Sequence, residues 1–211
     1  MSNQKYGLAI HTSSGQLGLG LLDLSQDNQI VAFWDLDRLM SSHFHQYLKE
    51  FIKDITWQDL AFIGVATGPG SFTSIRIGMI VARTLAQQLD IPLIPVSTLA
   101  SLAQHQVDNS SSGDDLIAAQ ISANSESYYV ALYQKDPERG IVVLSLPDQN
   151  MKSEDWQETL NQIESPYFLI TGENRLGYTV GSLLKLAHKT YLQGDLNHWR
   201  DALPYYPANN Y

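Results

Sequence analysis

The stretch GVATGPGSFTSIRIGM, residues 64–79, decides how the middle of this chain folds. An apolar run at residues 62–67 leads into it and predicts a buried strand. The Gly-Pro-Gly at residues 68–70 then predicts a sharp turn, because glycine and proline interrupt regular structure. From Ser71 to Leu89 apolar residues recur at helical spacing, so a long helix is expected after the turn.

Patterns on both sides extend this unit to β-β-β-α-β-α. Strands are expected at residues 6–10, 17–22, 30–36, 62–67 and 93–96. An apolar stripe from Phe44 to Ile55 predicts a helix with Ser41 or Ser42 as its N-cap, and Ser97 is expected to cap a third helix.

The same order returns after a loop rich in Asn, Ser and Gly at residues 108–115. The second set of strands is expected at residues 116–121, 128–133, 141–146 and 167–171, with helices at 153–163 and 178–189. This repeat of topology predicts two related α/β lobes, which we place at residues 1–108 and 109–211.

Composition excludes several classes of protein. With 44% hydrophobic and 17% charged residues, the 211-residue chain has the make-up of a soluble globular protein. A formal net charge of -9 opposes direct binding to a nucleic-acid backbone. The absence of cysteine excludes thiolate chemistry and fits a reducing cytoplasm. The start lacks the apolar stretch of a signal peptide and no run suits a membrane span, so we expect a cytoplasmic protein.

No arrangement of residues predicts catalysis. His43 and His45 are two apart, which places them on different sides of a helix and makes them a poor metal pair. Residues 68–71 could hold an anion at a helix N-terminus, but they lack the ending of a P-loop, and a tight turn with Ser71 as N-cap is favoured. We therefore expect no catalytic, cofactor-binding or metal-binding residue.

Three stretches carry a resemblance to a known family. LAIHTS at residues 8–13, the stretch at 64–79 and IPLIPVSTLASLA at 91–103 are similar to the pattern of the TsaB (YeaZ) family. LPYY at residues 203–206 looks like that family's closing Pro and Tyr. The resemblance is strong over residues 6–103 and weak beyond them.

The resemblance implies an ASKHA fold, that of actin, Hsp70 and sugar kinases, with two RNase H-like lobes. It also implies a non-catalytic accessory subunit, which binds and activates a TsaD-like catalytic partner in threonylcarbamoyl transfer to the adenosine next to the tRNA anticodon. TsaD carries the metal and the transfer site, and a TsaE-like ATPase joins the complex. The chain would then meet tRNA only through the complex and bind no cofactor alone, with room for a nucleotide at a complex interface.

Two departures from the family pattern argue against nucleotide hydrolysis. His11 stands where the family usually has Asp, and a neutral imidazole is a poor ligand for Mg²⁺. Residues 122–124 (Ser-Ala-Asn) replace the family's Asp-Ala-Arg, which removes a charged pair.

Two helices are expected to meet the partner. The helix after Ser71 is apolar around most of its circumference, which suits either enclosure in its own lobe or contact with another chain; the resemblance favours contact. Arg76 and Arg83 share a face, where they could pair with partner carboxylates or stay solvated. The expected interface residues are Phe44, Tyr47, Leu48, Phe51, Phe72, Ile75, Arg76, Met79 and Arg83.

Two alternatives stay open. One is a small ATPase or sugar kinase of the same fold, acting through Ser13, Ser14 and the glycine turn. The other is a homodimeric binding module that pairs through the same two helices.

Overall fold

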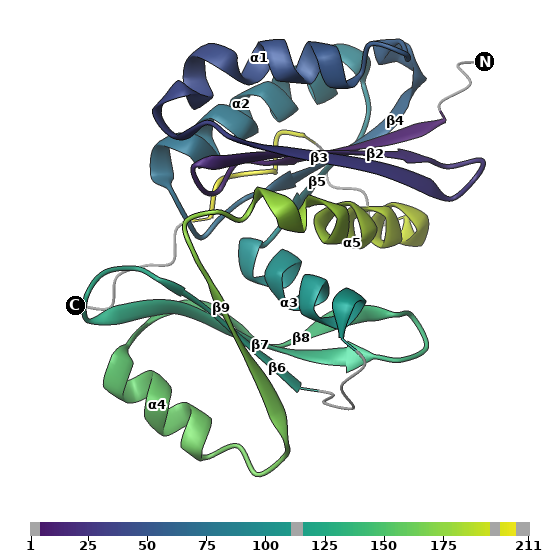
Figure 1. Ribbon diagram of the computed structural model, residues 1–211. Helices are drawn as coiled ribbons and strands as arrows, with labels where there is room; N and C mark the ends of the chain where they lie inside the picture. The colour runs from purple at the N-terminus through teal and green to yellow at the C-terminus, as the bar shows by residue number, and fades with distance from the viewer. Residues whose placement is uncertain (1–4, 111–115, 195–198, 206–211) are drawn as a thin grey trace.

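The computed structural model describes residues 5–110, 116–194 and 199–205 (Figure 1). The order β-β-β-α-β-α occurs twice, and one further strand and helix follow its first occurrence. The first set is β1 (Tyr6–His11), β2 (Gln16–Asp23), β3 (Asn28–Asp35), α1 (Met40–Phe51), β4 (Leu60–Ala66), α2 (Phe72–Leu89), β5 (Leu93–Val96) and α3 (Thr98–Asn109). The second set is β6 (Leu116–Ser122), β7 (Ser127–Asp136), β8 (Ile141–Lys152), α4 (Ser153–Asn161), β9 (Tyr167–Gly172) and α5 (Val180–Gln193). Short 3-10 helices lie at Asp37–Leu39 (η1), Trp57–Asp59 (η2) and Gly177–Thr179 (η3).

Two mixed sheets organise these elements. The first sheet has the order β3-β2-β1-β4-β5, in which β1 to β3 are antiparallel and β4 and β5 run parallel to β1. The second sheet has the order β8-β7-β6-β9 and repeats this plan with one strand fewer. The predicted fold class, α/β with the β-β-β-α-β-α order repeated in two sheets, is confirmed.

Helices cover both faces of each sheet. Figure 1 shows α1 and α2 on the outer face of the first sheet and α4 on the outer face of the second. Between the sheets, α5 packs on the first sheet and α3 on the second, and these two helices contact each other. Each half of the chain therefore contributes one helix to the region between the two sheets. The division into residues 1–108 and 109–211 stays a proposal.

The position of the central strand β4 explains why its sequence is a continuous apolar run. All residues of Leu60–Ala66 are buried, because α2 packs on one side of the strand and α5 on the other. Strands covered on both faces lose the alternation of apolar and polar residues. Within the described residues, no helix combines the length and apolarity that a membrane crossing requires.

The predicted N-cap positions are confirmed for α2 and α3 and differ for α1. Ser71 is the N-cap residue of α2, although its side chain makes no capping hydrogen bond. Ser97 caps α3 as predicted: its hydroxyl oxygen accepts the amides of Leu99 and Ala100. By contrast, α1 begins at Met40, directly after η1, so Ser41 and Ser42 lie inside the helix and neither is its N-cap. The helix also ends at Phe51, earlier than the apolar stripe predicted, since the chain turns there toward η2.

Candidate functional site

Four predicted interface residues belong to the core of this chain. Phe44 and Leu48 of α1, and Ile75 and Met79 of α2, are buried between the two helices and the first sheet. A stripe that faces a helix's own sheet has the same spacing as one that faces a partner, so the sequence pattern could not separate them. These side chains are not at the surface.

Two other predicted residues form an aromatic cluster on the β3 side of α1. The ring of Trp34 lies 4.8 Å from that of Tyr47 and 6.3 Å from that of Phe51, measured between centroids. All three side chains are half-buried against the core of the first sheet. This cluster lies on the flank of α1 that faces β3.

The remaining three predicted residues lie on the outer side of α2. Phe72 is 49% exposed, and the guanidinium of Arg76 stacks over its ring at 4.0 Å from the centroid. Arg83 is half-buried further along the helix. A cation over an aromatic face is attracted by the ring's quadrupole, so this pair presents a joint charged and apolar surface.

A groove between α1 and α2 gathers apolar side chains, and Leu48 is the one predicted interface residue among those that line it. Its volume is about 450 Å³, and its lining residues are Ser41, His45, Leu48, Lys49, Trp57, Ile77, Ile80, Val81, Thr84 and Leu85. Ile80 is 65% exposed, the largest exposure among the large hydrophobic side chains of the described residues. The signal was present in the sequence, since four of these α2 residues lie off the main apolar stripe. We call this surface the α1–α2 groove.

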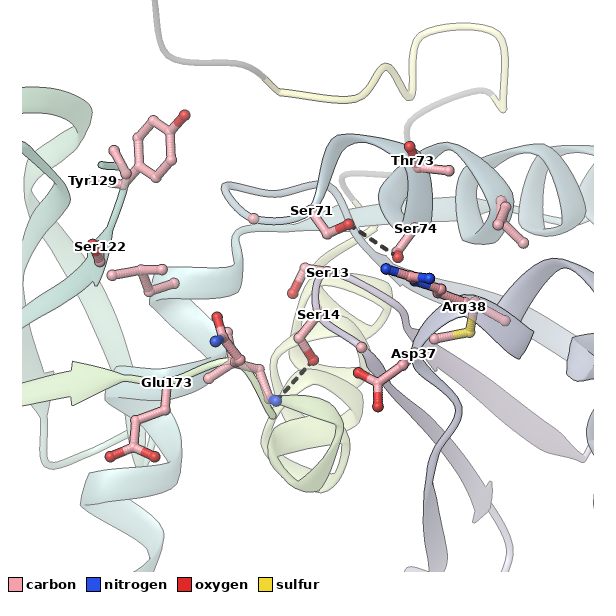
Figure 2. A pocket seen from close by; sticks show the side chains of 18 of the residues that line it. Ser13, Ser14, Asp37, Arg38, Ser71, Thr73, Ser74, Ser122, Tyr129 and Glu173 are labelled. Atoms are coloured by element: carbon pink, nitrogen blue, oxygen red, sulfur yellow. Dashed lines mark hydrogen bonds between the residues drawn. The ribbon is translucent and has the colours of Figure 1, made fainter. Parts of the chain in front are cut away.

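A second cavity, of about 770 Å³, lies between the two halves of the chain (Figure 2). Hydroxyl side chains dominate one wall, from Ser13 and Ser14 after β1 and from Ser71, Thr73 and Ser74 at the start of α2. Figure 2 shows Tyr129, Ser122 and Glu173 on the opposite wall. The serines largely bond protein groups: Ser71 donates to Ser74 (3.0 Å), and Ser14 accepts the amide of Leu176 (2.9 Å).

His11 ends β1 close to this cavity but does not line it. The side chain is fully buried, and burial lowers the pKa of His11 to about 3, so the imidazole is neutral at physiological pH. Its Nδ1 lies 3.5 Å from the Ser13 hydroxyl, and its Nε2 has no hydrogen-bond partner in the described part of the chain. A proton acceptor with so low a pKa is a weak base for catalysis.

The described residues contain no group of three or more His, Asp or Glu side chains placed to hold a metal ion. The Nδ1 atom of His43 and the hydroxyl of Ser42 share a hydrogen bond of 2.8 Å. His45 is exposed and lines the α1–α2 groove. Asp37, the acidic residue on the cavity wall nearest β1, pairs with Arg175 at 3.4 Å.

Comparison with known proteins identifies the family to which the chain belongs. The family model for TsaD, tRNA N6-adenosine threonylcarbamoyltransferase, matches residues 37–146. Two solved structures from Pseudomonas aeruginosa share the fold. One, described as similar to peptidase YeaZ, is 22% identical with a TM-score of 0.80 over 97% of this chain and 100% of that chain. The other, YeaZ, is 23% identical with a TM-score of 0.77 over 96% and 99%.

Sequence relatives are more specific. The tRNA threonylcarbamoyladenosine biosynthesis protein TsaB of Escherichia coli is 29% identical over 71% of this chain and 68% of its own length. The protein of that name from Bacillus subtilis is 35% identical over 80% of this chain and 72% of its own length. An identity of this size over most of both proteins means that the chain belongs to the TsaB family.

Proposed function

We propose that this chain is a non-catalytic subunit that binds and activates a TsaD-like catalytic partner in threonylcarbamoyl transfer to the adenosine next to the tRNA anticodon. The observation that carries the proposal is the α1–α2 groove, an apolar surface lined in part by the exposed side chain of Ile80, on a member of the TsaB family. An apolar groove of this kind on a soluble protein commonly marks a docking surface.

The choice of partner follows from similarity between the two chains. The matched residues 37–146 include both α1 and α2, so a TsaD-like chain is expected to carry a related helix pair. Two related helix pairs can pack about an approximate two-fold axis, each laying its exposed ridge in the other's groove. A specific interface needs at least ~1,000 Å² of buried surface, which the groove and the Phe72–Arg76 pair together can begin to supply.

Activation would work through conformation. If this chain binds one conformation of the partner more tightly than the others, it raises the population of that conformation without carrying out any chemistry itself. The TsaE-like ATPase would join this pair, and tRNA would be bound by other subunits, because the chain has a net charge of -9. We propose a cytoplasmic location, and self-association through the same groove when the partner is absent.

The rival enzyme function would use the 770 Å³ cavity. A kinase or ATPase needs carboxylates that hold Mg²⁺ near the phosphates. The end of β1 instead carries His11, buried and neutral. This residue favours the accessory role.

The test is threonylcarbamoyl transfer to tRNA by the cognate TsaD-like and TsaE-like proteins and the donor enzyme, with and without this chain. We expect transfer that depends on the chain and saturates when it is equimolar with the TsaD-like protein. Equal transfer in its absence, together with no association by light scattering, would reject the proposal. Tight binding of Mg-ATP by the isolated chain would support the rival.

A further inference from the structure

Tyr205 contacts two segments that are far from it in sequence. Its backbone amide donates a hydrogen bond to the carbonyl oxygen of Thr67, just after β4, at 2.8 Å. Its hydroxyl donates to the backbone carbonyl oxygen of Asp148, in β8, at 2.5 Å. One residue therefore joins the end of a central strand in the first sheet to an edge strand of the second.

The segment that carries Tyr205 is anchored in the first half of the molecule. Ala202 is fully buried in the core between the first sheet and its outer helices, and Trp199 packs against the same core. Leu203, by contrast, is 61% exposed and Tyr205 is 41% exposed. Residues 199–205 thus have a fixed base on the first sheet and reach the second sheet through one hydroxyl.

Asp148, which accepts the hydrogen bond from Tyr205, is itself held by two further hydrogen bonds. The carboxylate of Asp148 accepts hydrogen bonds from the hydroxyls of Ser97 at 2.5 Å and Tyr133 at 2.8 Å. Ser97 also caps α3, so Asp148 is tied to the point where the chain passes from β5 into α3. With both carboxylate oxygens engaged, the backbone carbonyl of Asp148 is left in a defined position for the Tyr205 hydroxyl.

The turn beneath Tyr205 is the Gly-Pro-Gly at residues 68–70, which leads into α2. Gly68 has φ +111°, and a Cβ there would stand 2.7 Å from the Tyr205 carbonyl oxygen, so the two backbones are in direct contact. The amide of Thr98 donates to the Gly68 carbonyl at 2.8 Å and thereby ties the turn to α3. The carbonyl of Thr67, at the base of the turn, is bonded by Tyr205.

We propose that residues 199–205 form a clasp that holds β8 of the second sheet against the Gly-Pro-Gly turn and fixes the start of α2. The clasp has two separable contacts: the backbone bond to Thr67 secures the turn, and the hydroxyl bond to Asp148 secures the two halves relative to each other. Because α2 carries the groove, the clasp also sets how the groove is presented. That last consequence rests on the proposed function, whereas the clasp itself does not.

Two substitutions perturb the clasp to different degrees. Tyr205→Phe deletes only the hydroxyl bond to Asp148, while Tyr205→Ala removes the whole ring, from which we expect a weaker backbone bond to Thr67. Leu203→Ala, at a 61% exposed neighbour, is the matched control. Since the chain contains no cysteine, spin labels can be placed specifically on cysteines introduced at the exposed positions Gln26, between β2 and β3, and Glu158, in α4.

Two readouts follow. Pulsed electron paramagnetic resonance should show a broader label-to-label distance distribution in Tyr205→Phe and Tyr205→Ala than in the parent. Hydrogen exchange of the Ser71 and Thr98 amides, which bond across the turn, should rise about fivefold in Tyr205→Ala and stay near the parent in Tyr205→Phe, as expected for loss of one hydrogen bond. Leu203→Ala should match the parent in both.

Distances and exchange in both Tyr205 variants that equal those of Leu203→Ala would overturn the clasp. Should Tyr205→Ala fail to fold, the distance distribution of Tyr205→Phe, which keeps the ring, decides alone. Neither readout involves the TsaD-like protein. Normal partner binding by an opened variant would therefore remove only the link to the groove, and failure of the proposed function would leave the clasp intact.

Discussion

The amide of Ser71 donates a hydrogen bond to the carbonyl oxygen of Ser13 at 2.7 Å, so the turn before α2 sits directly on the turn after β1. The residue before Ser71, Gly70, has φ +152°, and a Cβ built on it would overlap that carbonyl oxygen. Only glycine lets the two backbones approach so closely. The contact explains physically why the second glycine of the Gly-Pro-Gly stretch is needed.

Gly70→Ala should therefore lower the free energy of unfolding by about 2–3 kcal/mol, because both the backbone conformation and the space exclude a side chain. Gly140→Ala is the matched control, since Gly140 also has a positive φ (+64°) but nothing within 4 Å of the added Cβ. There we expect a loss of about 1 kcal/mol from the backbone alone. Urea denaturation measures both, and equal losses would contradict the contact with Ser13.

The groove predicts a variant that separates binding from folding. Ile80→Asp should abolish association with the TsaD-like protein and leave the fold intact, because the side chain is 65% exposed in the groove. Leu192→Asp, on α5 and 63% exposed, matches it in chemistry and exposure but lies away from the groove, and should bind normally. Light scattering measures association, and circular dichroism reports the fold. Normal association of folded Ile80→Asp would reject the groove as the interface.

The same substitution at a buried position should behave differently. Ile75 lies on the opposite side of α2, fully buried against the first sheet. Ile75→Asp places a carboxylate in an apolar core and should cost roughly 4 kcal/mol or more, so the chain is expected to unfold rather than merely lose its partner. A folded, monomeric Ile75→Asp protein in a thermal melt would show that this core position is wrongly described.

His11 should make stability depend on pH. Its folded-state pKa of about 3 is below the usual 6.5, so between these values the unfolded chain binds a proton that the folded chain does not. Stability is full above pH 6.5 and falls as the pH decreases, by about 3 kcal/mol between pH 7 and pH 4. His11→Leu should remove this part of the dependence, whereas His45→Leu, at an exposed histidine, should keep it. Urea denaturation midpoints measured from pH 4 to pH 7 test this prediction. If stability depends on pH as steeply in His11→Leu as in the parent, the low pKa of His11 is refuted.

Asp148 should contribute a slope of the opposite sign. Burial raises the pKa of its carboxyl, and the bonds from Ser97 and Tyr133 offset only part of that rise. The folded state therefore holds this proton more tightly, and stability falls as the pH increases from 3.8 through the raised pKa. Relative to Asp148→Asn, which cannot ionise, the parent should lose stability over that window. A difference between the two proteins that does not vary with pH would contradict this.

Local sequence patterns determined the order of the elements and most of their positions. Period-two and helical repeats identify strands and helices because they reflect which face of each element is buried, and a cap such as Ser97 acts within a few residues of its own helix. The doubled topology and the family resemblance followed from the same local information. Composition alone opposed direct binding to a nucleic-acid backbone, because the net charge is -9.

Only the tertiary structure decided which apolar residues are available to a partner. Ile75 and Ile80 are equally apolar and lie on one helix, but the first sheet covers Ile75 and leaves Ile80 in an open groove. The site of residues 199–205 is likewise invisible to local patterns, since Tyr205 bonds residues more than 50 positions away. A sequence records the preference of each residue for burial, but which neighbour provides it depends on contacts between distant segments that form only when the chain has folded.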